Sequence, residues 1–397
     1  MHTRIIRQYY ILASLFRAGG HALHSAIYVT FLMQHGLNLF EVNLVNACYF
    51  TAIFFCEIPT GVFADVFGRK HSFVTACGLM ALALFVYGSS QTLAGFIVAE
   101  LICAVAHTFE SGAFKAWFVD SLRHQGYEGN LSRIFGRERV IGQVAGGIAA
   151  ITGSYLYAIH PTLPWYLSSV ILIITMVAAH RIMKEDYFTR TMQLSWRNGL
   201  STMRDTAVTS IRYGMNDRAV RFTLIVTGIM SFAVMGLNMY WQPFFVNRSI
   251  DARNLGYIFG GIMIAIGIGS YLASRRKEGT DEKQLIVVNM ACTGVLVITA
   301  ALVPGVALAV FVFLLHEIPR GALSPLMDSY LHTRIPSRER ATISSFCSMA
   351  PHICGALGLL VSGLLANTWG IETAWIIAGT VLIVGALIVR NGRHPPT

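Results

Sequence analysis

Long apolar runs, separated by short polar connections, repeat along the whole chain. Each run is about as long as the ~20 apolar residues that an α-helix needs to cross a bilayer. The pattern predicts twelve helices, at residues 8–34, 41–63, 71–92, 94–122, 134–158, 163–183, 219–247, 255–275, 284–303, 305–332, 339–365 and 371–390. The sequence therefore predicts an all-α membrane protein with twelve transmembrane helices.

The longest polar segment, at residues 184–218, separates six of these helices from the other six. We expect it to be a cytoplasmic linker, with an amphipathic surface helix, between an N-terminal bundle at 1–183 and a C-terminal bundle at 219–397. Short matches at corresponding positions favour an internal duplication of the kind found in transporters. They pair Asp120-Ser121-Leu122 and Arg137-Glu138-Arg139 with Asp328-Ser329-Tyr330 and Arg338-Glu339-Arg340.

Composition and charge agree with a membrane protein. Hydrophobic residues make up 54% of the chain and charged residues only 13%, whereas soluble domains carry about 25% charged residues. A soluble enzyme and a disordered chain are therefore excluded. The net charge is +10, and most Lys and Arg residues fall on one side of the predicted topology. The positive-inside rule then puts both termini in the cytoplasm, and it explains the basicity better than a nucleic-acid or lipid-head-group site does.

A ten-residue motif follows the second predicted helix. It reads Gly61-Val62-Phe63-Ala64-Asp65-Val66-Phe67-Gly68-Arg69-Lys70 and resembles the major facilitator superfamily signature G-x-x-x-D-x-x-G-R-[RK]. The resemblance implies two six-helix bundles that rock about a central cavity lined by helices 1, 4, 7 and 10. It also implies a conformational latch made of Gly61, Asp65, Gly68, Arg69 and Lys70. In that latch, Asp65 finds a charge partner in Arg69, Lys70 or a facing helix end. The alternative is that Arg69 and Lys70 only anchor the topology.

Three cations lie deep inside predicted helices, well away from the helix ends, namely Arg17, Lys115 and Arg320. Charged side chains in a bilayer face protein or water-filled space, and these three lie in three of the four proposed cavity helices. The first helix adds polar residues that share a face with Arg17. The predicted substrate-cavity residues are Arg17, His21, His24, Tyr28, His107, Lys115, Asn238, Trp241, Gln242, His316 and Arg320. Helix–helix hydrogen bonding is the alternative role for such groups.

Four carboxylates in the predicted helices are candidates for proton coupling, because a carboxylate removed from water can hold a proton near neutral pH. Glu110 and Glu317 come first, and Glu57 and Glu100 second. The alternative for Glu110 is a permanent ion pair with Lys115 or Arg17. The alternative for Glu317 is an intrahelical pair with Arg320.

We expect no metal and no cofactor, with the proton gradient as the energy source, since the sequence has no phosphate-binding G-x-x-x-x-G-K-[ST] segment. Four glycines in the fifth helix, Gly142, Gly146, Gly147 and Gly153, partly resemble the drug/proton antiporter motif G-x-x-x-G-P-x-x-G-G. The proline of that motif is missing, and close helix packing explains the glycines equally well.

The sequence predicts a secondary active transporter that is not an enzyme and binds a small-molecule substrate but no nucleic acid. We expect a monomer in the bacterial cytoplasmic membrane that exports small organic compounds in a proton-coupled, drug-efflux-like manner. The first alternative is a proton-coupled importer of an anionic nutrient or metabolite. An alternative of another class is a non-transporting membrane receptor or assembly factor.

Overall fold

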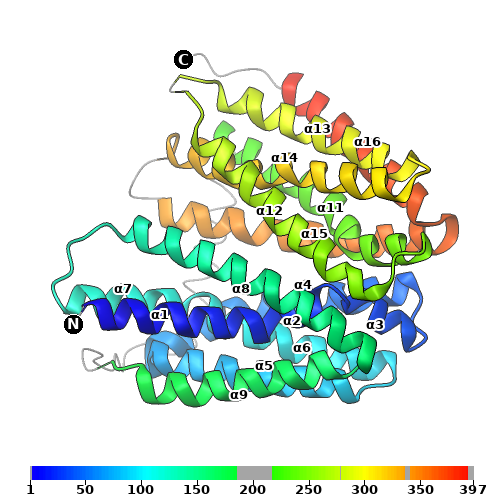
Figure 1. The fold of residues 1–397 in the computed structure, drawn as a ribbon. Coiled ribbons are helices and arrows are strands. Elements are labelled where there is room, and N and C mark those ends of the chain that lie inside the picture. The colour runs from blue at the N-terminus through cyan, green and yellow to red at the C-terminus, as the bar shows by residue number, and fades with distance from the viewer. Residues whose placement is uncertain (1, 186–216, 278, 336–339, 392–397) are drawn as a thin grey trace. The chain divides into compact units, whose positions relative to one another are not determined.

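The computed structural model describes residues 2–185, 217–277, 279–335 and 340–391, and the regular structure in them is helical (Figure 1). The first half contains α1 (His2–Arg17), η1 (Ala18–Ala22), α2 (Leu23–Ser25), α3 (Tyr28–Gln34), α4 (Leu39–Phe67), α5 (Arg69–Ser89), α6 (Leu93–Ser111), α7 (Ala113–His124), α8 (Leu131–Ile159) and α9 (Leu163–Ile182). The second half contains α11 (Arg218–Asn247), η2 (Ala252–Asn254), α12 (Leu255–Ser274), α13 (Glu282–Leu302), α14 (Val306–His332), α15 (Arg340–Trp369) and α16 (Ile371–Asn391).

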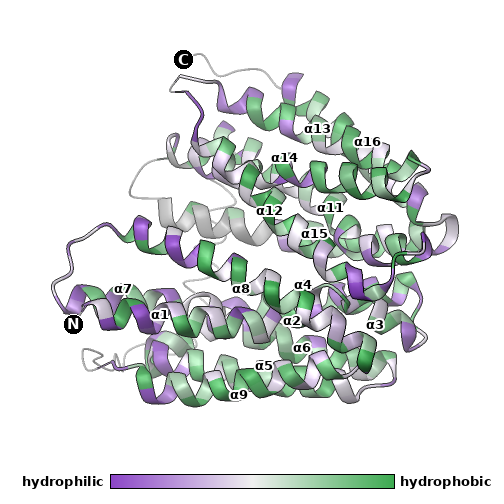
Figure 2. Ribbon diagram, viewed as in Figure 1, coloured by the Kyte–Doolittle hydropathy of each residue, from purple (hydrophilic) through white to green (hydrophobic). Residues whose placement is uncertain are grey.

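Eleven helices in the described residues are long and apolar enough to cross a membrane. The first predicted helix is not among them because it is interrupted and α1 has only 16 residues. Figure 2 shows hydrophobic residues along most of α13 and α16, while hydrophilic residues lie at the start of α13 and near both ends of α16. This distribution suits helices whose middle lies in hydrocarbon and whose ends reach the polar interface.

The chain divides into two compact units. Of the described residues, unit 1 comprises 2–36, 48–185 and 251–260, and unit 2 comprises the rest. This division differs from the predicted 1–183 and 219–397 bundles at the starts of α4 and α12, whose first residues group with the other unit. The predicted linker at 184–218 is described only at its ends, 184–185 and 217–218, so its predicted amphipathic helix lies outside the described residues.

Unit 1 is built around α5, which packs against α6 and α9, while α1 packs against α8 and α9 (Figure 1). Aromatic rings pack α7 against α1 and α5. Tyr9 stacks on Phe118 with 4.0 Å between ring centroids, and Phe73 stacks on Phe114 at 4.2 Å. Such stacking adds specific geometry to the apolar area that these side chains bury.

Unit 2 packs α13 against α14 and α16, and α11 against α15 and α16. Small residues bring the backbones close, as is common between membrane helices. A Cβ at Gly269 of α12 would collide with the carbonyl group of Ile318 in α14, and a Cβ at Gly358 of α15 would collide with the carbonyl group of Phe232 in α11. Only glycine fits at either contact.

Two predicted helices are divided in the structure. The helix predicted at 8–34 changes to a π-helical turn at Ala18–Ala22 and breaks again at Ile27, where φ is −125° and ψ is 3°. Gly19 and Gly20 lie in the π-helical turn and weaken the α-helix there, and such turns often occur at functional sites. The helix predicted at 94–122 becomes α6 and α7, with a turn at Gly112 between them.

Candidate functional site

Unit 1 contains a small, strongly charged cavity of about 220 Å³, here called the unit 1 cavity. Its walls come from α1, η1, α6, α7 and α8. Two cations, two carboxylates and one imidazole line it: Arg17, Lys115, Glu110, Glu138 and His21. Formal charges of both signs therefore meet around a space large enough for several water molecules, each of which takes up about 30 Å³ in the liquid.

Arg17 pairs with Glu138 in this cavity. The Arg17 Nη2 atom donates to Glu138 Oε1 over 3.0 Å, and the Glu138 side chain is only 10% exposed. The close approach of α8 to α1 and α2 depends on glycine, because a Cβ at Gly142 would lie 2.5 Å from Arg17 Nε in α1 and one at Gly153 would collide with the Leu23 carbonyl oxygen in α2. Gly142 and Gly153 thus have a packing role, whereas a Cβ at Gly147 would have nothing within 4 Å.

Sequence reasoning missed Glu138 as a site residue and treated it only as part of a repeated motif. A signal was available, since Glu138, Gly142 and Gly146 follow one another at intervals of four residues and therefore share a helix face. The two ion pairs suggested for Glu110, with Lys115 or with Arg17, are not formed, because the described residues include no ion pair or hydrogen bond to its carboxylate.

The predicted polar stripe of the first helix is split by the structure. Arg17 and His21 line the unit 1 cavity, but His24 and Tyr28 do not. His24 stacks on Trp165 with 4.7 Å between ring centroids, and Tyr28 Oη lies 3.1 Å from Tyr87 Oη. These two residues belong to the aromatic core beyond the cavity.

The second-rank carboxylates and His107 also lie outside the unit 1 cavity. Tyr87 Oη donates to Glu100 Oε2, so this buried carboxylate has a hydroxyl partner. Glu57 Oε2 in α4 is buried and has no hydrogen-bond partner in the described structure. His107 contacts the edge of the His21 ring with 6.1 Å between centroids, so it lies next to a cavity residue.

Unit 2 contains a larger cavity of about 420 Å³ between α11, α14 and α15, here called the unit 2 cavity. Both apolar and polar groups line its walls, among them Met230, Met235, Asn238, Met327, Arg320 and Asp328. The volume falls in the usual range for small-molecule sites, about 300–1,000 Å³. Methionine side chains also adapt their shape to different ligands.

Arg320 connects this cavity to a buried carboxylate behind it. Arg320 Nη1 donates to Glu317 Oε1 over 2.6 Å, which is the intrahelical pair considered from the sequence. The Glu317 side chain is 2% exposed, and His316 Nε2 lies 3.5 Å from the same oxygen. The other oxygen, Glu317 Oε2, is buried without a hydrogen-bond partner in the described structure. One side of this carboxylate is therefore left uncompensated.

Two candidates of the seventh predicted helix do not line the unit 2 cavity. Trp241 and Gln242 are both buried, and Trp241 packs parallel to Phe313 at 6.3 Å between ring centroids. Asn238, one turn earlier in α11, does line the cavity. Trp241 lies on nearly the same face of α11 as the lining residues Val234 and Asn238, so the open space ends along that face where Trp241 packs against Phe313.

The motif between α4 and α5 has a different ion pair from the one expected. Gly68 has φ +98°, a conformation that favours glycine, and begins the turn into α5. Arg69 pairs through its side chain with Asp120 at the end of the fourth predicted helix, and its backbone N–H donates to Glu185 Oε1 over 2.9 Å. Asp65 is exposed and forms no ion pair with any described residue. The acidic partner is therefore Asp120.

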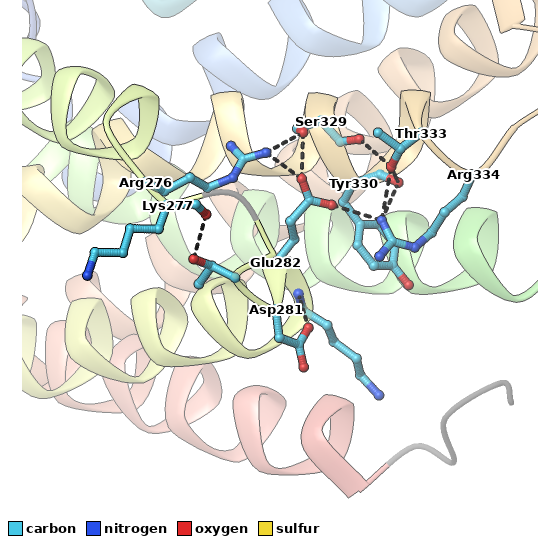
Figure 3. A network of polar contacts seen from close by, with 10 residues as sticks. Arg276, Lys277, Asp281, Glu282, Ser329, Tyr330, Thr333 and Arg334 are labelled. Atoms are coloured by element: carbon cyan, nitrogen blue, oxygen red, sulfur yellow. Dashed lines mark hydrogen bonds and ion pairs between the residues drawn. The ribbon is translucent and has the colours of Figure 1, made fainter. Parts of the chain in front are cut away.

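Unit 2 has a related network around Glu282 (Figure 3). Arg276 Nη2 donates to Glu282 Oε1 over 2.5 Å, and Arg334 Nη1 donates to Glu282 Oε2 over 2.8 Å. The Ser329 hydroxyl donates to Glu282 Oε1 over 2.5 Å and accepts from Arg276 over 2.6 Å. One carboxylate at the start of α13 thus connects the segment after α12 to both the end of α14 and the turn after it.

Comparison with known proteins settles the family. The sequence matches the family model described as Major Facilitator Superfamily over residues 10–353 and 224–397. The chain belongs to the Major Facilitator Superfamily. It is therefore a multi-pass membrane transporter of the secondary type and not an enzyme. The family and the all-helical fold predicted from the sequence are confirmed.

Two curated relatives come from Bacillus subtilis (strain 168). The chain is 21% identical to "Uncharacterized MFS-type transporter YxaM" over 383 residues, which is 92% of this chain and 90% of that protein. It is 25% identical to "Multidrug efflux protein YfmO" over 191 residues, 46% of this chain and 47% of that protein.

Solved structures share the fold. The nucleoside transporter NupG is 15% identical and aligns with a TM-score of 0.78 over 97% of this chain and 98% of its own. The human organic anion transporter MFSD10 (TETRAN) is 14% identical, with a TM-score of 0.67 over 98% of this chain and 99% of its own. At these identities the likeness concerns the fold alone.

Proposed function

We propose that this transporter exports small organic compounds in exchange for protons by alternating access. The observation that carries the proposal is the unit 2 cavity, where thioether and amide groups surround a space of about 420 Å³ and Arg320 joins that space to buried Glu317. A mostly apolar cavity with a few polar groups suits an amphipathic compound. The partial similarity to a multidrug efflux protein supports export.

Glu317 is our first candidate for the coupling proton. Its Oε1 atom binds Arg320, while its Oε2 atom is buried without a partner in the described structure. A substrate that draws Arg320 into the cavity would leave the carboxylate without its counter-charge, and proton binding would then remove the cost of a buried charge. Substrate and proton occupancy are thereby coupled through one side chain, and this coupling is reciprocal.

Glu110 is the second candidate and lies in unit 1. It has no hydrogen-bond partner among the described residues, while the neighbouring Arg17 is already paired with Glu138. Proton binding at Glu110 would change the balance of the two carboxylates and two cations that line this cavity. Because the two candidates lie in different units, single substitutions separate them.

Import of an anionic nutrient is the alternative that a specific observation favours. Arg320 lines the unit 2 cavity, and Arg17 and Lys115 line the unit 1 cavity. Arginine binds carboxylate and phosphate groups through two parallel hydrogen bonds. An importer would use these cations for the substrate itself, so the direction of flux decides between the two functions.

Transport by purified protein in proteoliposomes, with an imposed proton gradient and a panel of drugs and metabolites, tests the proposal. Glu317→Gln should abolish gradient-driven transport while substrate binding changes by no more than a few fold. Glu128→Gln, at an exposed position between α7 and α8, is the matched control and should behave as the wild type. Uptake of an anion with the inward proton gradient would support the importer. No flux of any compound would support a non-transporting receptor.

We further propose a monomer in the bacterial cytoplasmic membrane with both termini in the cytoplasm. The excess of Lys and Arg on the side of the termini supports this orientation. Single cysteines placed in residues 186–216, in a variant without the natural cysteines, should react with a membrane-impermeant reagent only from the cytoplasmic side. Labelling from outside would reverse the orientation.

A further inference from the structure

A third cavity, of about 230 Å³, lies in unit 1 where the start of α1 meets the ends of α7 and α9, and we call it the basic cavity. It shares no described lining residue with the unit 1 or unit 2 cavity. α7 and α9 are both parts of candidate membrane spans, which end at His124 and Ile182. The basic cavity therefore lies where spans end, at the depth of phospholipid head groups.

The lining of the basic cavity is positive. Arg4 from α1, Arg181 from α9 and Lys184 just after α9 all line it, together with His124. None of the described lining residues is acidic, and the three permanently charged side chains form no ion pair with any described residue. Three like charges around one small space repel one another, so an anion bound between them would be stabilised.

A buried side chain and a hydrogen bond hold the wall of the basic cavity in place. Trp117 is 1% exposed, and its Nε1 atom donates to the Lys184 carbonyl oxygen over 3.0 Å, which fixes the chain that carries Lys184. Gln125 also lines the cavity, but its Oε1 atom is buried and does not face the open space.

We propose that the basic cavity binds an anionic phosphate group. Arginine and lysine hold the phosphate oxygens, since guanidinium groups match phosphate geometry and ammonium groups act as point charges. The head group of phosphatidylglycerol presents such a phosphate at the depth of the cavity, and soluble glycerol phosphate has the same group without acyl chains.

The competing explanation is that these cations only complement helix dipoles. Arg181 lies in the last turn of α9 and His124 in the last turn of α7, where positive charge is favourable. That explanation does not account for Arg4, which lies near the beginning of α1, where positive charge is unfavourable. It also predicts that no particular anion is bound.

The test uses the full chain, purified in detergent, and measures lipid retention by native mass spectrometry and the melting temperature. The probes are phosphatidylglycerol, phosphatidylcholine, glycerol phosphate and inorganic phosphate. The test variant combines Arg4→Gln, Arg181→Gln and Lys184→Gln. The matched control combines Arg133→Gln, Arg139→Gln and Arg390→Gln, which removes the same charge from exposed positions outside the lining.

We expect phosphatidylglycerol to bind more tightly than phosphatidylcholine. Each basic residue near a membrane surface contributes about fivefold in affinity for anionic lipid, so the test variant should lose roughly 100-fold and the control should lose much less. A rise in the melting temperature with glycerol phosphate as well would support the site and show that a soluble phosphate ester can fill it. The single variant Lys184→Gln, with an expected loss of about fivefold, keeps the test decisive if the triple variant does not fold.

Two results would overturn the proposal. Equal losses of phosphatidylglycerol affinity in the test and control variants would mean that only general attraction to a positive surface holds the anion. Equal retention of phosphatidylglycerol and phosphatidylcholine, without protection by either soluble phosphate, would mean that the cavity does not select a phosphate anion.

Discussion

Glu282→Gln should destabilise the protein, because one carboxylate holds the Glu282 network together (Figure 3). Glutamine keeps one side-chain oxygen but loses the charge, and its amide group then faces two guanidinium groups. Arg276 and Arg334 would remain close to each other without an anion between them. The expected result is a loss of stability combined with a looser connection among α12, α13 and α14.

The size of this loss follows from the exposure of the three side chains. Glu282 is 11% exposed, Arg276 28% and Arg334 41%. Breaking a fully buried pair costs about 3–5 kcal/mol, and breaking an exposed pair costs about 0–1 kcal/mol. The nearly buried carboxylate with half-buried cations lies between these limits, so we expect about 2–3 kcal/mol for Glu282→Gln. Arg334→Gln should cost about 1 kcal/mol, since Glu282 keeps Arg276 and Ser329.

The assay is denaturant-titrated unfolding in mixed micelles, applied to a double-mutant cycle of Glu282→Gln and Arg334→Gln. The double variant should lie within about 0.5 kcal/mol of Glu282→Gln alone, because the ionic partner of Arg334 is already gone and only its local contacts with Tyr330 and Thr333 remain to be lost. Glu372→Gln is the control, since Glu372 is 53% exposed and 3.8 Å from Arg248, and it should cost at most about 1 kcal/mol. Additive losses in the cycle would refute the network as the source of stability.

Three further outcomes are expected. Gly153→Ala should reduce the free energy of unfolding by about 1–3 kcal/mol, because the added methyl group would meet a backbone carbonyl. Gly147→Ala in the same helix is the control and should be tolerated, since its methyl group would enter open space. Folded yield and denaturant-titrated unfolding of the two variants provide the comparison. Asn43→Ala should cost about 1–3 kcal/mol in the same unfolding assay, because the Nδ2 atom of fully buried Asn43 lies within hydrogen-bond distance of three oxygens in unit 2. Asp120→Asn removes the partner of Arg69 and should slow transport turnover with little change in substrate binding. Asp328→Asn changes a residue that lines the unit 2 cavity and should change substrate binding. The reverse pattern in proteoliposomes would contradict these roles.

Most of the fold could be predicted because the bilayer imposes a simple length rule. In hydrocarbon, a run of about 20 apolar residues can pair its backbone N–H and C=O groups only as a helix. Hydropathy alone therefore predicts α13 and α16. The division of the first helix was not predicted. The π-helical turn at Ala18–Ala22 arises where Arg17 and α8 meet, and such a contact between distant segments leaves little trace in local hydropathy.

The candidate site was predicted in part, for a related reason. Rare charges inside apolar runs single out Arg17, Glu110 and Arg320, because burial of a charge is costly and needs a purpose. The choice of partner is set by helix rotation and by gaps at glycines, which one sequence does not specify. Glu138 was therefore missed, although its spacing from Gly142 puts both on one helix face.

In each half, an arginine after a predicted helix pairs with a carboxylate, but the carboxylate occupies a different position in the two halves. In unit 1, Arg69 after the second predicted helix pairs with Asp120 at the end of the fourth. In unit 2, Arg276 occupies the corresponding place but pairs with Glu282, and its contact with the end of α14 is the hydroxyl of Ser329. Asp328, which corresponds to Asp120, instead lines the unit 2 cavity. Since Glu282 supplies the structural carboxylate, Asp328 is free to face the cavity, and this asymmetry between repeats supports substrate contact in unit 2.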